Sequence, residues 1–261
     1  MYEFNDTIRG TPKVTFNLKT TIGEKVLEEE LNNDLGTFRT LTVSGRDVVD
    51  LEHQTTSVLG RNGEYFHNAT VEVRKLEIKA KITGKDNQSM RLQYEKLNRL
   101  IVSHNQVFLS FSDEPDRNYL GIFKSKDVPE EVSNEQIIGL VFICYDPFKM
   151  SDIKTKKGNV VQNDGLFNTK PIVTLNLSSP TKEIRLLHVE SQKYIRLTGT
   201  YTTDEIKIDM ATGKITQNGR NILGDLDMVN SRYFELLPGK NTLQCDNANA
   251  SITAEFREVY L

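Results

Sequence analysis

Most of the chain alternates apolar and polar residues with a period of two, which is the pattern of half-buried β-strands. The stretch VRKLEIKAKITG, residues 73–84, is the clearest example, because its charged residues fall on one face. The opposite face carries four apolar residues: Leu76, Ile78, Ala80 and Ile82. Just upstream, Val71 and Val73 have the other parity. We therefore expect a β-bulge near Arg74 and Lys75, where one extra residue would let the strand change faces.

One stretch departs from this period and predicts an amphipathic helix at about residues 87–102. In DNQSMRLQYEKLNRLIV, apolar side chains recur every three or four positions. They are Met90, Tyr94, Leu97 and Ile101. Asp86 or Asn87 can cap the first turn by accepting a hydrogen bond from a backbone N–H group. The pattern is typical of a helix that packs on a sheet, and we assign it no cofactor role.

Strands resume after the helix, and the last of them ends abruptly. QVFLSFS and YLGIFKSK flank the turn-rich DEPDRN, which predicts a hairpin. The later apolar run, residues 137–145, is far shorter than the ~20 residues needed to cross a bilayer, so we expect no membrane insertion. It predicts a buried strand that stops at Pro147, which cannot donate to a sheet. Both the odd-numbered and the even-numbered residues of this strand are apolar, which indicates that both of its faces are covered. A neighbouring subunit is one candidate for covering one of the faces.

Beyond Met150 the alternation of apolar and polar residues gives way to a polar, basic stretch, and we expect a second domain. Residues 151–165, SDIKTKKGNVVQNDG, are polar and basic and predict a linker. Short strands with turns and no helix follow: PIVTLNL, EIRLLHVE, KYIRLTG, DEIKIDM, YFELL, NTLQC and SITAEFREVYL. The length of 261 residues suits two domains. We predict a mainly β protein with a β-sandwich-like domain carrying one α-helix over residues 1–150, then an all-β jelly-roll or galectin-like sandwich over residues 151–261.

Composition narrows the functional classes. The formal net charge of -3 at pH 7, with lysines and glutamates interspersed, gives no basic excess that would gather phosphate groups, so we expect no specific nucleic-acid binding. The start of the chain, MYEFNDTIRG, has neither a basic cluster nor an apolar segment, which predicts folding in a cytoplasm. Cys144 and Cys245 form no Cys-x-x-Cys pair and lie in different predicted domains. We expect both to be buried thiols.

Few residues could carry catalysis or bind a metal ion. There is no phosphate-binding glycine loop, nucleophile elbow or His-Glu-x-x-His helix. GRDVVDLEH gathers four groups that could bind a cation: Asp47, Asp50, Glu52 and His53. One histidine beside acids is most often a solvated loop or edge, so we predict no metal site there. Glu205 and Asp209 share a strand face, but Lys207 lies between them, which indicates an ordinary charged surface. We therefore predict no catalytic residue, no cofactor and no metal.

A carbohydrate-binding role is the main alternative that the second domain allows. Sugar-binding faces need a flat aromatic ring on which the sugar stacks, and the chain contains no tryptophan. Tyr194, Tyr201 and Tyr233 are the remaining candidates, although tyrosines of a β-sandwich usually pack half-buried. A β-sandwich hydrolase is the third hypothesis.

The order of these features resembles the distal tail proteins of long-tailed, non-contractile bacteriophages. The resemblance covers nearly the whole chain and rests on short motifs taken together: DPFK at 146–149, GRNG at 60–63, FNTKP at 167–171, Asp209 followed by Asn218-Gly219, and LLPGKN at 236–241. Asn62 stands where the family more often has Asp, and Met150 stands where an aromatic residue often follows the lysine. Both departures concern turn chemistry and packing, and neither touches a catalytic group.

The resemblance implies a structural virion protein and no enzyme. Such proteins form a hexameric ring at the distal end of the tail tube, as one ring or two stacked rings, with the first domains making the ring. The implied partners are other copies of the chain, the tail tube protein, the tail-associated tip protein, and receptor-binding or baseplate proteins. DNA would pass through the ring without specific binding. The protein would fold in the bacterial cytoplasm and end at the tail tip, without an inserted carbohydrate-binding module of its own.

Overall fold

The computed structural model describes residues 18–128, 133–246 and 250–261. The chain divides into two compact units, which are treated separately below. The first comprises the described residues up to Pro115 together with Tyr119–Pro147, and the second comprises Asp116–Asn118 and Phe148–Leu261.

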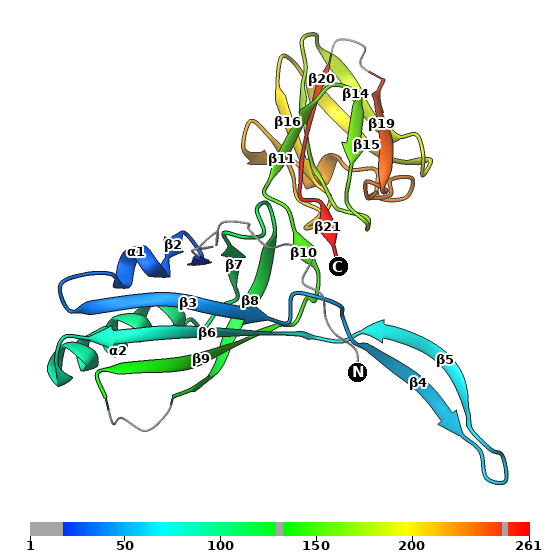
Figure 1. The fold of residues 1–261 in the computed structure, drawn as a ribbon. Coiled ribbons are helices and arrows are strands. Elements are labelled where there is room, and N and C mark those ends of the chain that lie inside the picture. The colour runs from blue at the N-terminus through cyan, green and yellow to red at the C-terminus, as the bar shows by residue number, and fades with distance from the viewer. Residues whose placement is uncertain (1–17, 129–132, 247–249) are drawn as a thin grey trace, which may run out of the picture. The chain divides into compact units, whose positions relative to one another are not determined.

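The first unit is built on an antiparallel sheet with the strand order β2-β1-β7-β8-β9-β6-β3 (Figure 1). Its strands are β1 (Thr20–Ile22), β2 (Lys25–Val26), β3 (Gly36–Ser44), β6 (Arg74–Gly84), β7 (Val107–Phe111), β8 (Asn118–Asp127) and β9 (Glu135–Cys144). The predicted pairing of β7 with β8 is confirmed. Two helices, α1 (Leu27–Leu31) and α2 (Asn87–Ile101), pack against this sheet in the described part of the unit.

Helix α2 follows the sequence prediction closely. The Asp86 side chain caps it by accepting a hydrogen bond from the Ser89 backbone N–H at 2.7 Å. Three of the four predicted core residues are buried, and the fourth, Tyr94, is partly buried against the same cluster. Helix α1 is an addition to the one predicted helix. Its five residues are too few to show a helical period in the sequence. In the structure, Leu27 and Leu31 at its two ends are buried in the core.

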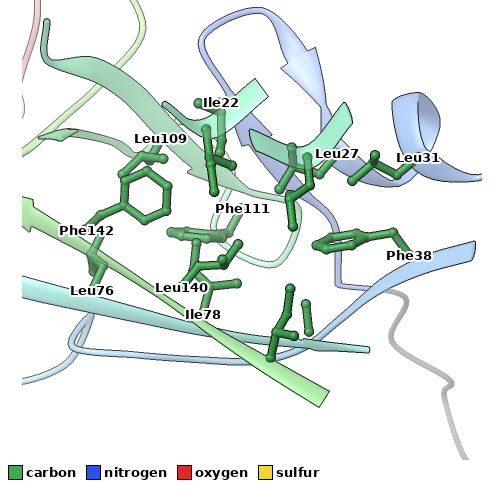
Figure 2. Close-up of a cluster of buried hydrophobic side chains, with 14 of the residues drawn as sticks. Ile22, Leu27, Leu31, Phe38, Leu76, Ile78, Leu109, Phe111, Leu140 and Phe142 are labelled. Atoms are coloured by element: carbon green, nitrogen blue, oxygen red, sulfur yellow. The ribbon is translucent and has the colours of Figure 1, made fainter. Parts of the chain in front are cut away.

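The core of the first unit lies on one face of the sheet, as the alternation predicted. All four predicted inward residues of β6 are fully buried. Leu76 and Ile78 pair with Phe142 and Leu140 of β9. Figure 2 shows these side chains meeting Phe111, with Phe38, Leu27 and Leu31 in the same cluster.

One prediction for this sheet is wrong in detail. No bulge occurs at Arg74 and Lys75, because β6 pairs with β9 in unbroken register from Arg74 onward. The change of faces falls instead at the two residues before Arg74, where one strand ends before β6 begins. On the second face of β9, Val141 is buried and Ile137 is 57% exposed, so cover of this face by a neighbouring subunit stays a prediction. The helices bury only the face that carries Ile138 and Leu140.

The second unit consists of two antiparallel sheets around its own core. One has the order β11-β20-β13-β16-β17-β18 and the other β12-β19-β14-β15. The first contains β11 (Lys154–Lys157), β13 (Ile172–Asn176), β16 (Glu205–Asp209), β17 (Ile215–Gln217), β18 (Arg220–Asn221) and β20 (Ser251–Phe256). The second contains β12 (Val160–Asn163), β14 (Thr181–His188), β15 (Lys193–Tyr201) and β19 (Gly239–Cys245). A short pair, β10 (Lys149–Met150) with β21 (Val259–Tyr260), and a 3-10 turn, η1 (Leu223–Asp225), complete the unit.

The predicted linker is wrong, because residues 151–165 contain strands β11 and β12. Strand β11 pairs with β20 at the edge of its sheet, and its three lysines hide the strand pattern. Charged edge strands protect a sheet from unwanted pairing, so the lysines fit the position. YFELL is also no strand and contributes only an isolated bridge between Leu236 and Thr169. The other predicted strands of this unit are present.

The LLPGKN turn is closed by the fully buried Asn241. Its side-chain oxygen accepts from the Leu237 N–H at 2.7 Å and lies 2.9 Å from Nε2 of His188, which is also buried. Its amide donates to the carbonyl groups of Leu237 and Gly239.

We expect Asn241→Ala to lower the free energy of unfolding by about 2 kcal/mol, because buried polar groups lose their partners. Urea denaturation measures this. Lys240→Ala, at the exposed neighbouring position, should change little, and equal effects would contradict the assignment.

Candidate functional site: an exposed hairpin

A two-stranded hairpin of the first unit contributes no buried side chain to the core of that unit. Strands β4 (Leu51–Ser57) and β5 (Glu64–Val71) pair only with each other. Figure 1 shows them leaving the first unit at the ends of β3 and β6. Every residue of β4 is exposed, and β5 is exposed along most of its length. The GRNG motif forms the tip, where Gly60 and Gly63 adopt φ of 85° and 81°, values that favour glycine.

One face of the hairpin is apolar at several positions. The register places Leu51 opposite Val71 and Thr55 opposite Phe66, so these side chains share a face. The His53 ring meets Phe66 edge-on, with ring centroids 5.7 Å apart. Phe66 is nonetheless 63% exposed. The exposed apolar residues of the hairpin and of the segments that flank it are Val48, Leu51, Val58, Leu59, Tyr65, Phe66 and Val73. We call this set the hairpin surface.

The hairpin surface has the character of a docking surface. A lone two-stranded hairpin is at best marginally stable in water, because it has no third layer to cover its apolar face. Leu51 and Phe66 share one face, whereas Tyr65 lies on the other face, opposite Thr56. Exposed apolar side chains that gather on one face of a folded protein often mark an interaction site. The sequence analysis did not find this surface, because β4 contains a single large apolar residue, Leu51, and so lacks a visible alternation.

The four candidate metal ligands lie at this hairpin without forming a metal site. Asp47 and Asp50 precede β4, whereas Glu52 and His53 occupy successive positions on it and point to opposite faces. Within residues 18–128, 133–246 and 250–261, no group of three or more His, Cys, Asp or Glu side chains is arranged to hold a metal ion.

Of the two carboxylates weighed for catalysis, Asp209 has a structural role. It accepts hydrogen bonds from the backbone N–H groups of Ala211 and Thr212 and from the Thr212 hydroxyl, which closes the turn after β16. Burial disfavours its charged form, but these hydrogen bonds prevail and hold the pKa of Asp209 below its ordinary value. A carboxylate held ionised by its own turn is poorly placed to act as a general acid.

The three candidate sugar-stacking tyrosines are engaged by the protein itself. Tyr201 is fully buried and donates to Asp225 at 2.9 Å. Tyr233 is partly buried and donates to the carbonyl of Gly213 at 2.8 Å. The guanidinium of Arg185 lies 4.3 Å from the Tyr194 ring centroid. These contacts support packing roles for all three.

The two cysteines differ in burial. Burial raises the pKa of Cys144 to about 12, so its thiol stays protonated and inert. Cys245 is only partly buried, which corrects the expectation that both would be buried. Neither forms a disulfide. In the part of the chain that the structure describes, no helix has the length and apolar character needed to cross a bilayer.

Comparison with known proteins identifies the family. Residues 25–144 match the phage tail protein RIFT-related domain, and residues 164–260 match the siphovirus-type tail component, C-terminal domain. The distal tail protein of Bacillus phage SPP1 is 27% identical over 234 residues, which covers 86% of this chain and 91% of that protein. The chain belongs to the distal tail protein family. It is a structural component of a phage tail.

Solved structures of tail proteins share this fold. The crystal structure of the SPP1 distal tail protein, described as a paradigm of the hub adsorption apparatus in phages that infect Gram-positive bacteria, has a TM-score of 0.81 at 22% identity. It covers 94% of this chain and 99% of its own. A component of the phage P2 baseplate, in its activated conformation with Ca, has a TM-score of 0.54 at 10% identity, over 91% of this chain and 97% of its own. The family resemblance and the mainly β, sandwich-like fold predicted from the sequence are confirmed.

Proposed function

We propose that this distal tail protein forms a hexameric ring at the end of the tail tube. As an adaptor, it would join the tube protein to the tail-tip and receptor-binding or baseplate proteins. The observation that carries the proposal is the hairpin surface, an apolar docking element on the unit that matches the RIFT-related tail domain. The similarity to a distal tail protein described as a hub, and to a baseplate component, supports the same role.

A second copy of the chain is the occupant that suits the hairpin surface best. A closed ring needs a heterologous contact, in which each subunit gives one surface and receives a different one. A hairpin that reaches away from its own core can cover its apolar face on the next subunit without altering either fold. Phe66 and Leu59 would then be the central contacts, because large buried side chains dominate interface energetics.

The proposal has no catalytic step, and we propose no cofactor or metal. The net charge of -3 fits a ring through which DNA passes without adhering, since a strongly basic wall would retain phosphate groups. Retention of duplex DNA by the assembled ring at physiological salt would contradict this electrostatic part. The site of action would be the virion tail tip, after assembly in the host cytoplasm.

The mass of the purified protein tests the ring directly. We expect light scattering on a sizing column to give the mass of six or twelve chains as concentration rises, because a heterologous interface closes only when the full circle is complete. A mass of one chain at every concentration, with and without the purified tail tube protein, would contradict the proposal.

A further inference from the structure

The hairpin is fixed to its unit by contacts at its root, which we define as Gly45, Arg46 and Arg74. These residues follow β3 or begin β6, so they lie where the hairpin meets the sheet. Because the hairpin itself is exposed, its direction depends on how the root is held. A two-stranded ribbon without other support would otherwise sample many directions.

The Arg74 side of the root is buried and hydrogen-bonded. Arg74 is 5% exposed, and it donates from Nε to the carbonyl of Pro147 and from Nη1 to the carbonyl of Gly45, both at 2.8 Å. Gly45 has a φ of +86°, and a Cβ at this position would lie 1.9 Å from the carbonyl oxygen of Lys75. The residue after β3, the start of β6 and the proline after β9 are therefore tied together in one arrangement.

The Arg46 side is a surface ion pair. Arg46 donates from Nη1 and Nη2 to the two carboxylate oxygens of Asp113, at 2.6 and 2.8 Å, and Nη1 lies 3.8 Å from Oε2 of Glu114. Its guanidinium also lies over the Phe111 ring, 5.0 Å from the centroid. The hydrogen bonds from Arg46, the largest influence, hold the pKa of Asp113 below its ordinary value, so the pair is charged near neutral pH. Two parallel hydrogen bonds fix orientation as well as distance.

We propose that the Arg46–Asp113 ion pair positions the hairpin for assembly, with Arg46 as a positioning residue for ring closure. This inference rests on the proposed ring. The side chains of the pair are 18% and 26% exposed, so solvent screening limits what the pair adds to folding stability. Ring formation, in contrast, depends on the orientation of the hairpin. Each hairpin must contact the next subunit at the angle that lets the ring close. Holding the hairpin before contact lowers the entropy lost on docking.

The test separates positioning from folding. We expect Arg46→Gln and Asp113→Asn to keep the melting temperature of the parent chain, yet to raise the concentration at which rings form by at least about tenfold. The exchanged pair, Arg46→Asp with Asp113→Arg, should recover a large part of the association. Arg99→Gln, at an exposed position near the end of α2, is the matched control and should assemble like the parent.

Each other outcome overturns a stated claim. Equal association of the parent and Arg46→Gln would overturn the positioning role while leaving the ring proposal intact. A loss of association matched by a lower melting temperature would make Arg46 a folding residue. Failure of the exchanged pair to recover association would show that the ion pair is not what positions the hairpin. A parent chain that never assembles would remove the proposed ring itself.

Discussion

Lys154→Met is expected to lower the free energy of unfolding of the second unit by about 1–3 kcal/mol, because a buried carboxylate loses one of its hydrogen-bond partners. The lysine side chain is itself 31% exposed, so solvent screens part of the interaction. The carboxylate of Glu258 is 1% exposed, and Nζ of Lys154 lies 2.7 Å from it. Tyr260 donates a further hydrogen bond to Glu258 at 2.7 Å. Without the lysine, a charge would remain buried with too little compensation. Urea denaturation followed by far-UV circular dichroism measures the change.

The pH dependence of the stability lost in Lys154→Met tests whether the ion pair with Glu258 is the source of that loss. Burial disfavours the charge on Glu258, but hydrogen bonds from Lys154, Tyr260 and the Asp164 N–H outweigh it and hold its pKa below the ordinary value. A lowered pKa stabilises the fold above the pKa of the unfolded chain, and this contribution is lost as pH falls through the folded value. In the variant the carboxyl accepts a proton more readily, so the deficit should shrink as the solution is acidified.

Two further variants control this experiment. Lys156→Met removes an exposed lysine of the same strand, β11, and should have little effect. Combining Lys154→Met with Glu258→Gln removes the unpaired carboxylate charge and should recover part of the lost free energy of unfolding. A deficit in Lys154→Met that is small, or that is independent of pH, would contradict the buried ion pair as its source.

Replacing residues 51–71 with an Asn-Gly turn is expected to abolish ring formation while leaving the melting temperature nearly unchanged. The backbone N–H of Glu72 already donates to the carbonyl of Asp50 at 3.0 Å, so a two-residue turn can join these ends. The deleted strands contribute almost nothing to the core of the first unit. Light scattering should give the mass of one chain under conditions in which the parent chain forms rings.

Point variants locate the effect on the hairpin surface. Leu59→Ser combined with Phe66→Ser should weaken association by about a hundredfold or more, since interface anchors of this kind each contribute about 1–2 kcal/mol or more. Thr70→Ser is a mild change on the same hairpin and should assemble like the parent. Rings that persist after the hairpin is removed would assign assembly to another surface.

Sequence reasoning was most reliable where burial imposes a period. Strand β6 alternates cleanly because one face meets the core and the other meets water, and α2 carries both an apolar stripe and a capping Asp86. It failed where that constraint is weak. Lys156 and Lys157 of β11 lie at an exposed sheet edge and resemble a linker. The change of parity before Arg74 predicted a bulge, because the sequence alone does not show that a strand stops and another starts.

The hairpin surface was the hardest feature to predict. Leu59 and Phe66 are exposed in the described chain, so no periodic partner distinguishes them from ordinary surface residues. GRNG pointed to a turn, but a turn alone does not reveal whether the strands that it joins are covered. The root depends on contacts between distant positions, such as Arg46 with Asp113, and these appear only in the folded chain.

The exposed tip at Gly60 and Gly63 also bears on how such proteins diversify. No core side chain depends on the tip, so residues can be added or lost there in pairs while the strand register behind them persists. The length of the hairpin can thus change during evolution without changing the stability of the domain that carries it. In the proposed ring, a longer or shorter hairpin would therefore change the tightness of the contact between subunits while the folded body stays the same.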